Sequence, residues 1–218
     1  MPETISLWPD SSGADTFSIE RSLFAQGYAT VAGTDEVGRG PLAGPVVAAC
    51  VVLPPDCDYQ IFQDSKKITE KARKALAVTL REIKAMIGIG IVSPADIDRI
   101  NILQASLLAM KKAVEQLSVA PDFLLVDGKF KVPLALAQQP LIKGDSRSAS
   151  VAAASIIAKV TRDEMMEAFH ERYPVYNFKK HKGYPTAEHR RLIKEHGPCG
   201  IHRLSFKPVR ACLENPKK

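Results

Sequence analysis

The stretch from Tyr28 to Leu53 reads YATVAGTDEVGRGPLAGPVVAACVVL and determines the expected fold. Two segments within it, Tyr28–Glu36 and Pro45–Leu53, are rich in β-branched residues and flank the glycine-rich Val37–Gly44. This pattern predicts two neighbouring strands joined by a tight connection. The second strand is apolar throughout, so we expect it to be buried.

Outside this stretch, helical and strand-like patterns alternate, which is typical of an α/β fold. Possible helix starts occur at Ser93-Pro94 and Asp98–Asn101. We predict helices at Ser18–Gln26, Thr69 to about Met86, Ile102–Leu117, Ser148 to about Arg172 and Thr186–His196, and further strands at Gly88–Val92, Phe123–Val126 and Leu141-Ile142.

The positive charge of the chain is unevenly distributed. The 218 residues carry a net charge of +6, but residues 172–218 hold 12 Lys and Arg against three Asp and Glu, a local net charge of +9. Such a segment suits an anionic partner such as nucleic acid. We therefore predict a loose tail over residues 1–14, a main α/β domain over residues 15–172 and a basic helical appendage over residues 173–218.

Several classes of protein are disfavoured by what the sequence lacks. The longest apolar run, Val46–Leu53, is far shorter than the roughly 20 residues of a membrane-spanning helix, so we expect no membrane segment. Phosphate-loop, dinucleotide-binding and nucleophile-elbow motifs are missing. The amino-terminal residues lack a secretory signal pattern, and the four cysteines form no C-x-x-C pair. Free thiols and a cytoplasmic location are expected.

Four acidic residues stand at predicted strand ends: Asp35 and Glu36 after the first strand, Asp127 after the fourth and Asp145 after the fifth. Such ends can converge on one edge of a sheet, and crowded carboxylates bind protons or a hard divalent cation. Adjacent residues face opposite sides of a regular strand, so Asp35 and Glu36 share a site only if the strand ends or bulges there. Four separate, solvated strand-end acids are the alternative.

Glycines and cations accompany these acids. Gly38-Arg39-Gly40 permits a ligand to approach the backbone closely, although a hairpin turn explains the same string. Ser65 and Lys66 precede a predicted helix and suit a phosphate, or form a solvated helix start. The cations around Asp145 are expected to be ordinary helix-surface charges: Lys143, Arg147, Lys159 and Arg162.

The basic appendage contains two further motifs. His181-Lys182-Gly183-Tyr184 places an aromatic ring among cations, which suits stacking on a sugar or base, or else Tyr184 is a core residue. His196, Cys199 and His202 have a spacing that resembles a zinc site. The glycines and proline between them indicate a turn and a fourth ligand is missing, so zinc is disfavoured.

Together these motifs resemble bacterial ribonuclease HII. The resemblance runs from about Tyr28 to Val209 with the motifs in family order, and the Gly-Arg-Gly form favours type HII over type HIII. The motifs that carry it are GTDEVGRGP from Gly33, DSKK from Asp64, VDG from Val126, KGDS from Lys143, the segment Ala152–Asp163, HKGY from His181 and HRLSF from His202.

The resemblance implies an RNase H-like fold, with a five-stranded mixed sheet flanked by helices and a small C-terminal helical region. It implies that Asp35, Glu36, Asp127 and Asp145 are catalytic and bind metal. Gly38, Arg39 and Gly40 would recognise the ribose 2′-hydroxyl, and Tyr184 would stack on the adjacent sugar. Ser65 and Lys66 are further expected substrate contacts.

The implied reaction is hydrolysis of the RNA strand of RNA–DNA hybrids and nicking at single ribonucleotides in duplex DNA, leaving 3′-hydroxyl and 5′-phosphate ends. Two Mg²⁺ or Mn²⁺ ions held by carboxylates would serve this chemistry without a histidine base. A monomer is expected. The alternatives are a non-catalytic hybrid-binding protein that uses the basic appendage and a nuclease of the same fold that cleaves plain DNA.

Overall fold

The computed structural model describes residues 15–62 and 68–214, which form a five-stranded mixed sheet. The strand order is β3-β2-β1-β4-β5, and the predicted five-stranded mixed sheet is confirmed. β1 pairs antiparallel with β2 and parallel with β4, while β2–β3 is antiparallel and β4–β5 is parallel. The strands are β1 Val31–Val37, β2 Val46–Val52, β3 Met86–Val92, β4 Phe123–Asp127 and β5 Ala137–Leu141.

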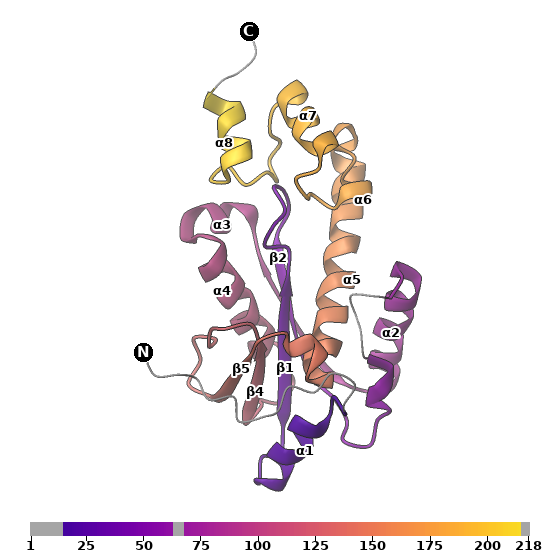
Figure 1. Ribbon diagram of the computed structural model, residues 1–218. Helices are drawn as coiled ribbons and strands as arrows, with labels where there is room; N and C mark the ends of the chain where they lie inside the picture. The colour runs from indigo at the N-terminus through magenta and orange to yellow at the C-terminus, as the bar shows by residue number, and fades with distance from the viewer. Residues whose placement is uncertain (1–14, 63–67, 215–218) are drawn as a thin grey trace.

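Helices cover both faces of the sheet (Figure 1). The long helix α5 (Ala149–Arg172) and α2 (Glu70–Glu82) pack on one face, and α4 (Ile102–Glu115) with α3 (Pro94–Ile100) packs on the other. Because the central strands are covered on both sides, β2 is almost wholly buried. None of the helices in the described residues is long and apolar enough to cross a membrane.

The helix start signals in the sequence act as side-chain caps. Thr69 caps α2 by accepting from the amide of Ala72, and Ser93 caps α3 by accepting from the amide of Asp96. Ser148 caps α5, and its hydroxyl also donates to the buried carboxyl of Glu20 over 2.6 Å. Glu20 belongs to α1 (Ser18–Ala25), which is thereby joined to the start of α5.

The C-terminal region lies at the opposite end of α5 from α1 (Figure 1). It is hydrogen-bonded to the β1–β2 connection, because the amide of Leu42 donates to Gly183 O and that of Gly44 donates to Ile201 O. The predicted helix at Thr186–His196 is confirmed as α7, whereas α8 was not predicted. The elements are the 3-10 turn η3 Pro174–Tyr176 and the helices α6 Phe178–His181, α7 Ala187–His196 and α8 Lys207–Glu214.

Some predicted boundaries were wrong for local reasons. β1 begins at Val31 rather than Tyr28, because the amides of Ala29 and Thr30 bind the Asp122 carboxylate instead of a neighbouring strand. α2 ends at Glu82, since Lys84 adopts a left-handed backbone with φ 59° that breaks the helix.

Candidate active site: an acidic cavity beside the central strands

Asp35 and Asp127 lie side by side on adjacent parallel strands. The pairing of β1 with β4 ends at Thr34 opposite Val126, so the next residue on each strand is one of these acids. Together with Glu36 they line a cavity of about 400 Å³. The structure therefore brings three of the four predicted acids into one site.

Asp145 lies next to this group but is not one of the residues that line the cavity. It is buried in the 3-10 turn η2 (Gly144–Ser146), which follows β5. The amide of Gly144 donates to Asp127 Oδ1 over 2.6 Å. The fourth acid is thus tied to the site through the peptide that precedes it.

Asp35 and Glu36 share the cavity although β1 neither ends nor bulges between them. Glu36 and Val37 remain in regular register with β2, so the expected interruption of the strand is wrong. Pairing with β4 has already stopped at Thr34, which leaves that edge of β1 open to the cavity. The Asp35 carboxylate accepts from the amide of Glu36, and Arg39 holds the Glu36 carboxylate at 3.2 Å.

The carboxylates of the site repel one another. Burial raises the pKa of Asp35 well above its usual range, and the carboxylates of Asp127 and Glu36 raise it further, whereas a hydrogen bond from Ser155 opposes the shift. Burial also raises the pKa of Glu36, with Arg39 opposing and Asp127 adding to the rise. Such a group is stabilised by taking up protons or by binding a cation.

The donor set fits a hard divalent cation, since it consists of carboxylate oxygens. In the described residues, no three His, Cys, Asp or Glu side chains already converge as a complete metal site.

Cations and an aromatic ring border the acids. Arg39, Arg73 of α2 and Lys159 of α5 line the same cavity as Gly38, Gly40 and Tyr184. Tyr184 is 40% exposed, so it is not a core tyrosine. A cavity lined by both acids and cations suits a metal ion and the phosphates of a nucleic acid.

Three polar residues of the cavity, Arg73, Ser155 and Lys159, were not predicted as site residues, and Lys159 was expected to be an ordinary helix-surface charge. Ser155 was detectable as a hydroxyl that follows the three alanines Ala152–Ala154 on a buried helix. Arg73 lies in the first turns of α2, and no sequence pattern around it indicates a site residue. Ser65 and Lys66, which were predicted to bind substrate, lie outside the described residues.

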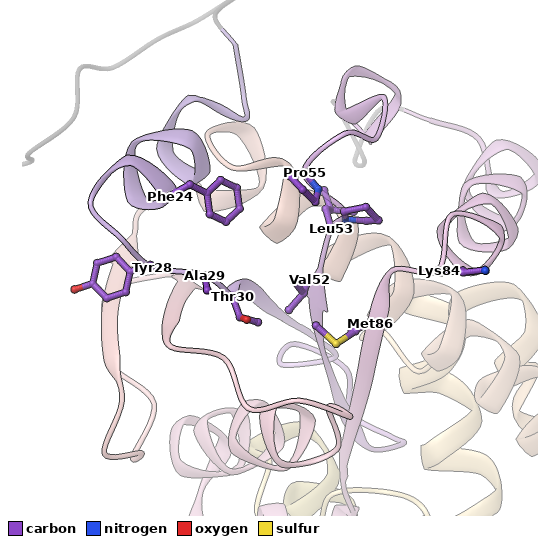
Figure 2. A pocket seen from close by; sticks show the side chains of 10 residues that line it. Phe24, Tyr28, Ala29, Thr30, Val52, Leu53, Pro55, Lys84 and Met86 are labelled. Atoms are coloured by element: carbon purple, nitrogen blue, oxygen red, sulfur yellow. The ribbon is translucent and has the colours of Figure 1, made fainter.

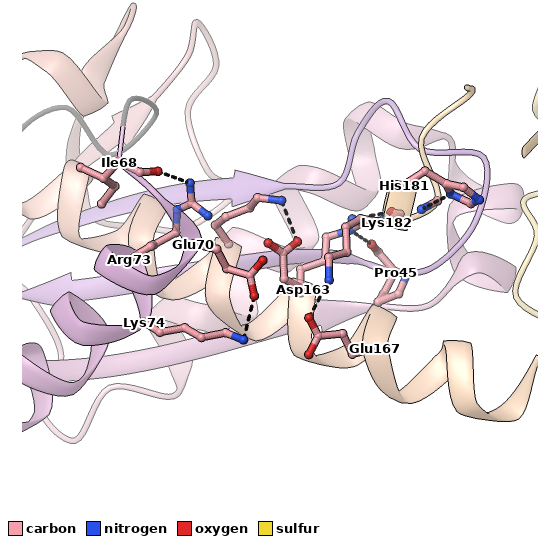
Figure 3. A network of polar contacts seen from close by, with 12 residues as sticks. Pro45, Ile68, Glu70, Arg73, Lys74, Asp163, Glu167, His181 and Lys182 are labelled. Atoms are coloured by element: carbon pink, nitrogen blue, oxygen red, sulfur yellow. Dashed lines mark hydrogen bonds and ion pairs between the residues drawn. The ribbon is translucent and has the colours of Figure 1, made fainter. Parts of the chain in front are cut away.

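Other predicted contacts have different roles. Lys182 does not face the cavity, because its ammonium pairs with Glu167 of α5 over 2.7 Å (Figure 3). His181 is buried and bonds to Tyr176 O over 2.6 Å. Arg162, expected on a helix surface, is completely buried, because the C-terminal region covers that part of α5.

A second cavity, of about 460 Å³, has different chemistry. It lies at the other end of the central strands, near the start of β1 and β3 and the end of β2 (Figure 2). Its walls include Phe24, Tyr28, Leu53 and Met86, and Lys84 is the charged residue among those that line it. With no carboxylate in its lining, it does not compete with the acidic cavity as a catalytic site.

Comparisons with known proteins agree with this geometry. The family model of ribonuclease HII matches residues 32–209. Ribonuclease HII of Desulfotalea psychrophila is 61% identical over 203 residues, covering 92% of this chain and 90% of that protein. The chain belongs to the ribonuclease HII family. The preference for type HII over type HIII, made on the Gly-Arg-Gly string, is confirmed.

Solved structures confirm the RNase H-like fold. The ribonuclease H2 of Pyrococcus horikoshii OT3 matches with a TM-score of 0.72 at 27% identity, over 85% of this chain and 98% of that one. A Bst-RNase HIII solved in complex with Mn²⁺ has a TM-score of 0.66 at 21% identity, over 86% of this chain and 70% of that one.

Membership of the ribonuclease HII family establishes the class of reaction. The protein is an endoribonuclease with RNase H activity on RNA–DNA hybrids, and a non-catalytic hybrid-binding protein is not favoured. Divalent metal dependence fits both this family and the carboxylate cavity. The four cysteines are free thiols, as predicted.

Proposed function

We propose that the protein nicks duplex DNA at single embedded ribonucleotides, in addition to cleaving hybrids, and leaves 3′-hydroxyl and 5′-phosphate ends. The observation that carries this proposal is that one cavity holds both the acids and the glycine loop Gly38–Gly40. The 2′-hydroxyl is the chemical difference between RNA and DNA at one nucleotide, and a glycine backbone can approach it closely.

Asp35, Glu36, Asp127 and Asp145 would hold the divalent ions, Mg²⁺ or Mn²⁺. Two such ions would activate a water molecule and stabilise the leaving oxygen during phosphodiester hydrolysis. The chain itself orients the acids: Ser155 bonds to Asp35, and the amide of Gly144 bonds to Asp127. No histidine is among the residues that line the cavity, so the described site offers carboxylates rather than an imidazole as proton acceptors.

Other residues of the cavity would hold the nucleic acid. Arg73 and Lys159 border the acids and can neutralise phosphates on either side of the cleaved bond. Tyr184 presents its exposed ring to the cavity and would stack on the sugar beside the ribonucleotide. Arg39 would contact the substrate with its backbone while its side chain holds Glu36.

The test uses a DNA duplex that carries one ribonucleotide, incubated with the protein and Mg²⁺ or Mn²⁺. A single nick is expected, with end groups identified by mass spectrometry. Asp35→Asn should lose at least about 99% of the activity, because a metal ligand and its charge are removed. Glu115→Gln, an exposed acid at the end of α4, is the matched control and should retain full activity.

Two outcomes would reject the proposal. An intact ribonucleotide duplex under conditions that cleave a hybrid would restrict the activity to hybrids. Equal cleavage of an all-deoxy duplex would instead indicate a DNA nuclease of the same fold.

We further propose that the protein acts as a monomer in the cytoplasm. Free cysteines suit a reducing compartment, and a nucleic-acid substrate is present there. Light scattering of the purified protein tests the monomer, and a dimer mass at micromolar concentration would contradict it.

A further inference from the structure

Two arginines, Arg162 in the middle of α5 and Arg203 between α7 and α8, are completely buried. Burial lowers the pKa of both guanidinium groups, and that of Arg203 falls to about 9. Within residues 15–62 and 68–214, neither arginine forms an ion pair with a carboxylate. Burying a cation without such a partner costs free energy, because the charge loses its hydration. The hydrogen bonds that the two guanidinium groups make must therefore offset this cost.

Arg203 directs all three of its side-chain nitrogens at one loop. Nη2 donates to Gly38 O over 2.5 Å, Nη1 to Arg39 O over 3.1 Å and Nε to Gly44 O over 3.0 Å. These carbonyls belong to the connection between β1 and β2. A single planar guanidinium therefore fixes both ends of this loop.

Arg162 supports the same loop from the side of α5. Its nitrogens donate to Ala43 O and Pro45 O over 3.1 Å each and to Lys182 O over 3.0 Å. Figure 3 shows Pro45 and Lys182 converging at this point. The guanidinium carbon also lies 6.0 Å from the centre of the Tyr184 ring. Arg162 thus joins the glycine loop to the segment that carries Tyr184.

The position of Gly38 against Arg162 leaves no room for a side chain. Its backbone has φ +100°, and a Cβ atom there would lie 2.4 Å from Arg162 Nε. Only glycine allows the loop to turn in this way while resting on the arginine.

The carbonyl contacts determine where the loop presents its amides. A trans peptide is planar, with its C=O and N–H pointing in opposite directions. Because Gly38 O and Arg39 O point at Arg203, the N–H groups of Arg39 and Gly40 point away from it. Among the residues that the structure describes, no backbone carbonyl or side chain accepts from either amide. Two unused donors therefore face the side on which Gly38, Arg39 and Gly40 line the cavity.

We propose that Arg162 and Arg203 are positioning residues for sugar discrimination: together they hold the Arg39 and Gly40 amides and the Tyr184 ring in the arrangement that distinguishes ribose from deoxyribose. This inference rests on the proposed function. Neither arginine contacts the reacting atoms, and both act through the loop that they bind.

The experiment compares how the enzyme binds two duplexes of identical sequence. KM is measured for the duplex with one ribonucleotide, and Ki for the all-deoxy duplex as a competitive inhibitor of the same reaction. The ratio Ki/KM reports sugar discrimination. In Arg203→Lys and Arg162→Lys the charge is kept but most of the carbonyl contacts are lost, so the ratio should fall about tenfold, mainly through KM.

Leu23→Ala is the control for lost stability, since it removes buried side-chain contacts from a hydrophobic cluster that contains no residue of the β1–β2 connection. Lower stability alone reduces the fraction of active enzyme and therefore kcat, but leaves the ratio unchanged. An unchanged ratio in both folded lysine variants would overturn the proposal. A wild-type enzyme that fails to cleave the ribonucleotide duplex would instead reject the proposed function.

A measurement on the wild-type protein covers the case in which neither lysine variant folds. The side-chain Nε–H resonances of Arg162 and Arg203 in ¹⁵N-labelled protein should shift when the ribonucleotide duplex binds and change less with the all-deoxy duplex. Equal responses to the two duplexes would overturn the proposal.

Discussion

The amide of Gly144 donates to Oδ1 of Asp127, which joins the turn after β5 to the end of β4. This bond holds the turn that contains the following residue, Asp145, beside Asp127, although Asp145 does not line the cavity. The positions of two predicted metal ligands are therefore coupled, since Asp127 has both a direct role in the cavity and an indirect role in holding the turn.

Asp127→Ala should consequently affect more than one ligand, because it removes both the Asp127 carboxylate and the acceptor of the Gly144 amide. We expect activity with Mg²⁺ to fall at least about a hundredfold, and the apparent metal affinity to fall as well. Titration of activity with Mg²⁺ and with Mn²⁺ measures both effects, and EDTA should abolish wild-type activity reversibly. A variant with unchanged metal affinity would contradict the role of Asp127.

Gly38 and Gly40 should respond differently to alanine. Among the described residues, a Cβ at Gly40 would meet Tyr184 Cε1 alone, at 3.8 Å. Gly40→Ala should therefore keep the wild-type melting temperature while losing about tenfold in kcat/KM through blocked substrate approach. Gly38→Ala should lower the stability by about 1–3 kcal/mol, because of its positive φ and its contact with Arg162. Thermal unfolding and kinetics on both variants check this contrast, and equal melting temperatures for the two would contradict it.

Tyr184 should act through its ring rather than its hydroxyl. Stacking on a nucleotide is worth about 1–3 kcal/mol, so Tyr184→Ala should reduce kcat/KM by about 10-fold to 100-fold. Tyr184→Phe keeps the ring and should retain most of the activity. Equal losses in both variants, measured on the ribonucleotide duplex, would assign the effect to the hydroxyl instead.

Stability should depend on pH through two buried histidines of the C-terminal region. Burial lowers the pKa of His189 and His202 from about 6.5 to about 4, and their Nε2 atoms lie 3.1 Å apart in a hydrogen bond. The ring of His189 contacts those of His181 and Phe178, and the ring of His202 contacts those of Tyr176 and Phe178 as well as Cys199. Proton uptake by either ring would disrupt this packed group.

The lowered pKa values determine the direction in which stability changes with pH. The unfolded chain binds protons below about pH 6.5 and the folded protein only near pH 4, so the free energy of unfolding should decrease as pH falls through this window. Urea unfolding between pH 4 and 7 measures the change. The partly exposed His196 provides the control, since His196→Asn should preserve the pH dependence. The raised pKa values of Asp35 and Glu36 contribute with the opposite sign, so the histidine contribution is read from the difference between the wild-type and His202→Gln profiles. Identical profiles would contradict the prediction.

Local sequence patterns were sufficient to predict much of the fold and of the site. The β-branched runs of β1 and β2 and the Ser148 cap of α5 lie close to their predicted positions because local propensity and tertiary packing agree there. β5 was misplaced, since its sequence AQQPL lacks a strand pattern and is held by pairing with β4.

The roles of Arg162 and Arg203 could not be predicted from local patterns. An arginine on a helix is usually exposed, and only the covering C-terminal region makes these two buried. Arg73 reaches the cavity for a similar reason, because the packing of α2 beside α5 is a tertiary property.

The bond from Arg203 to Gly38 spans 165 residues of the chain and has a consequence for biosynthesis. Contacts between such distant segments form late, since the loop-closure entropy must be overcome and both segments must have been synthesised. A nascent chain that has already exposed all four acids on the ribosome still lacks Arg203, so its glycine loop is not yet fixed. The order of synthesis thereby delays substrate discrimination until the C-terminal segment has emerged and packed.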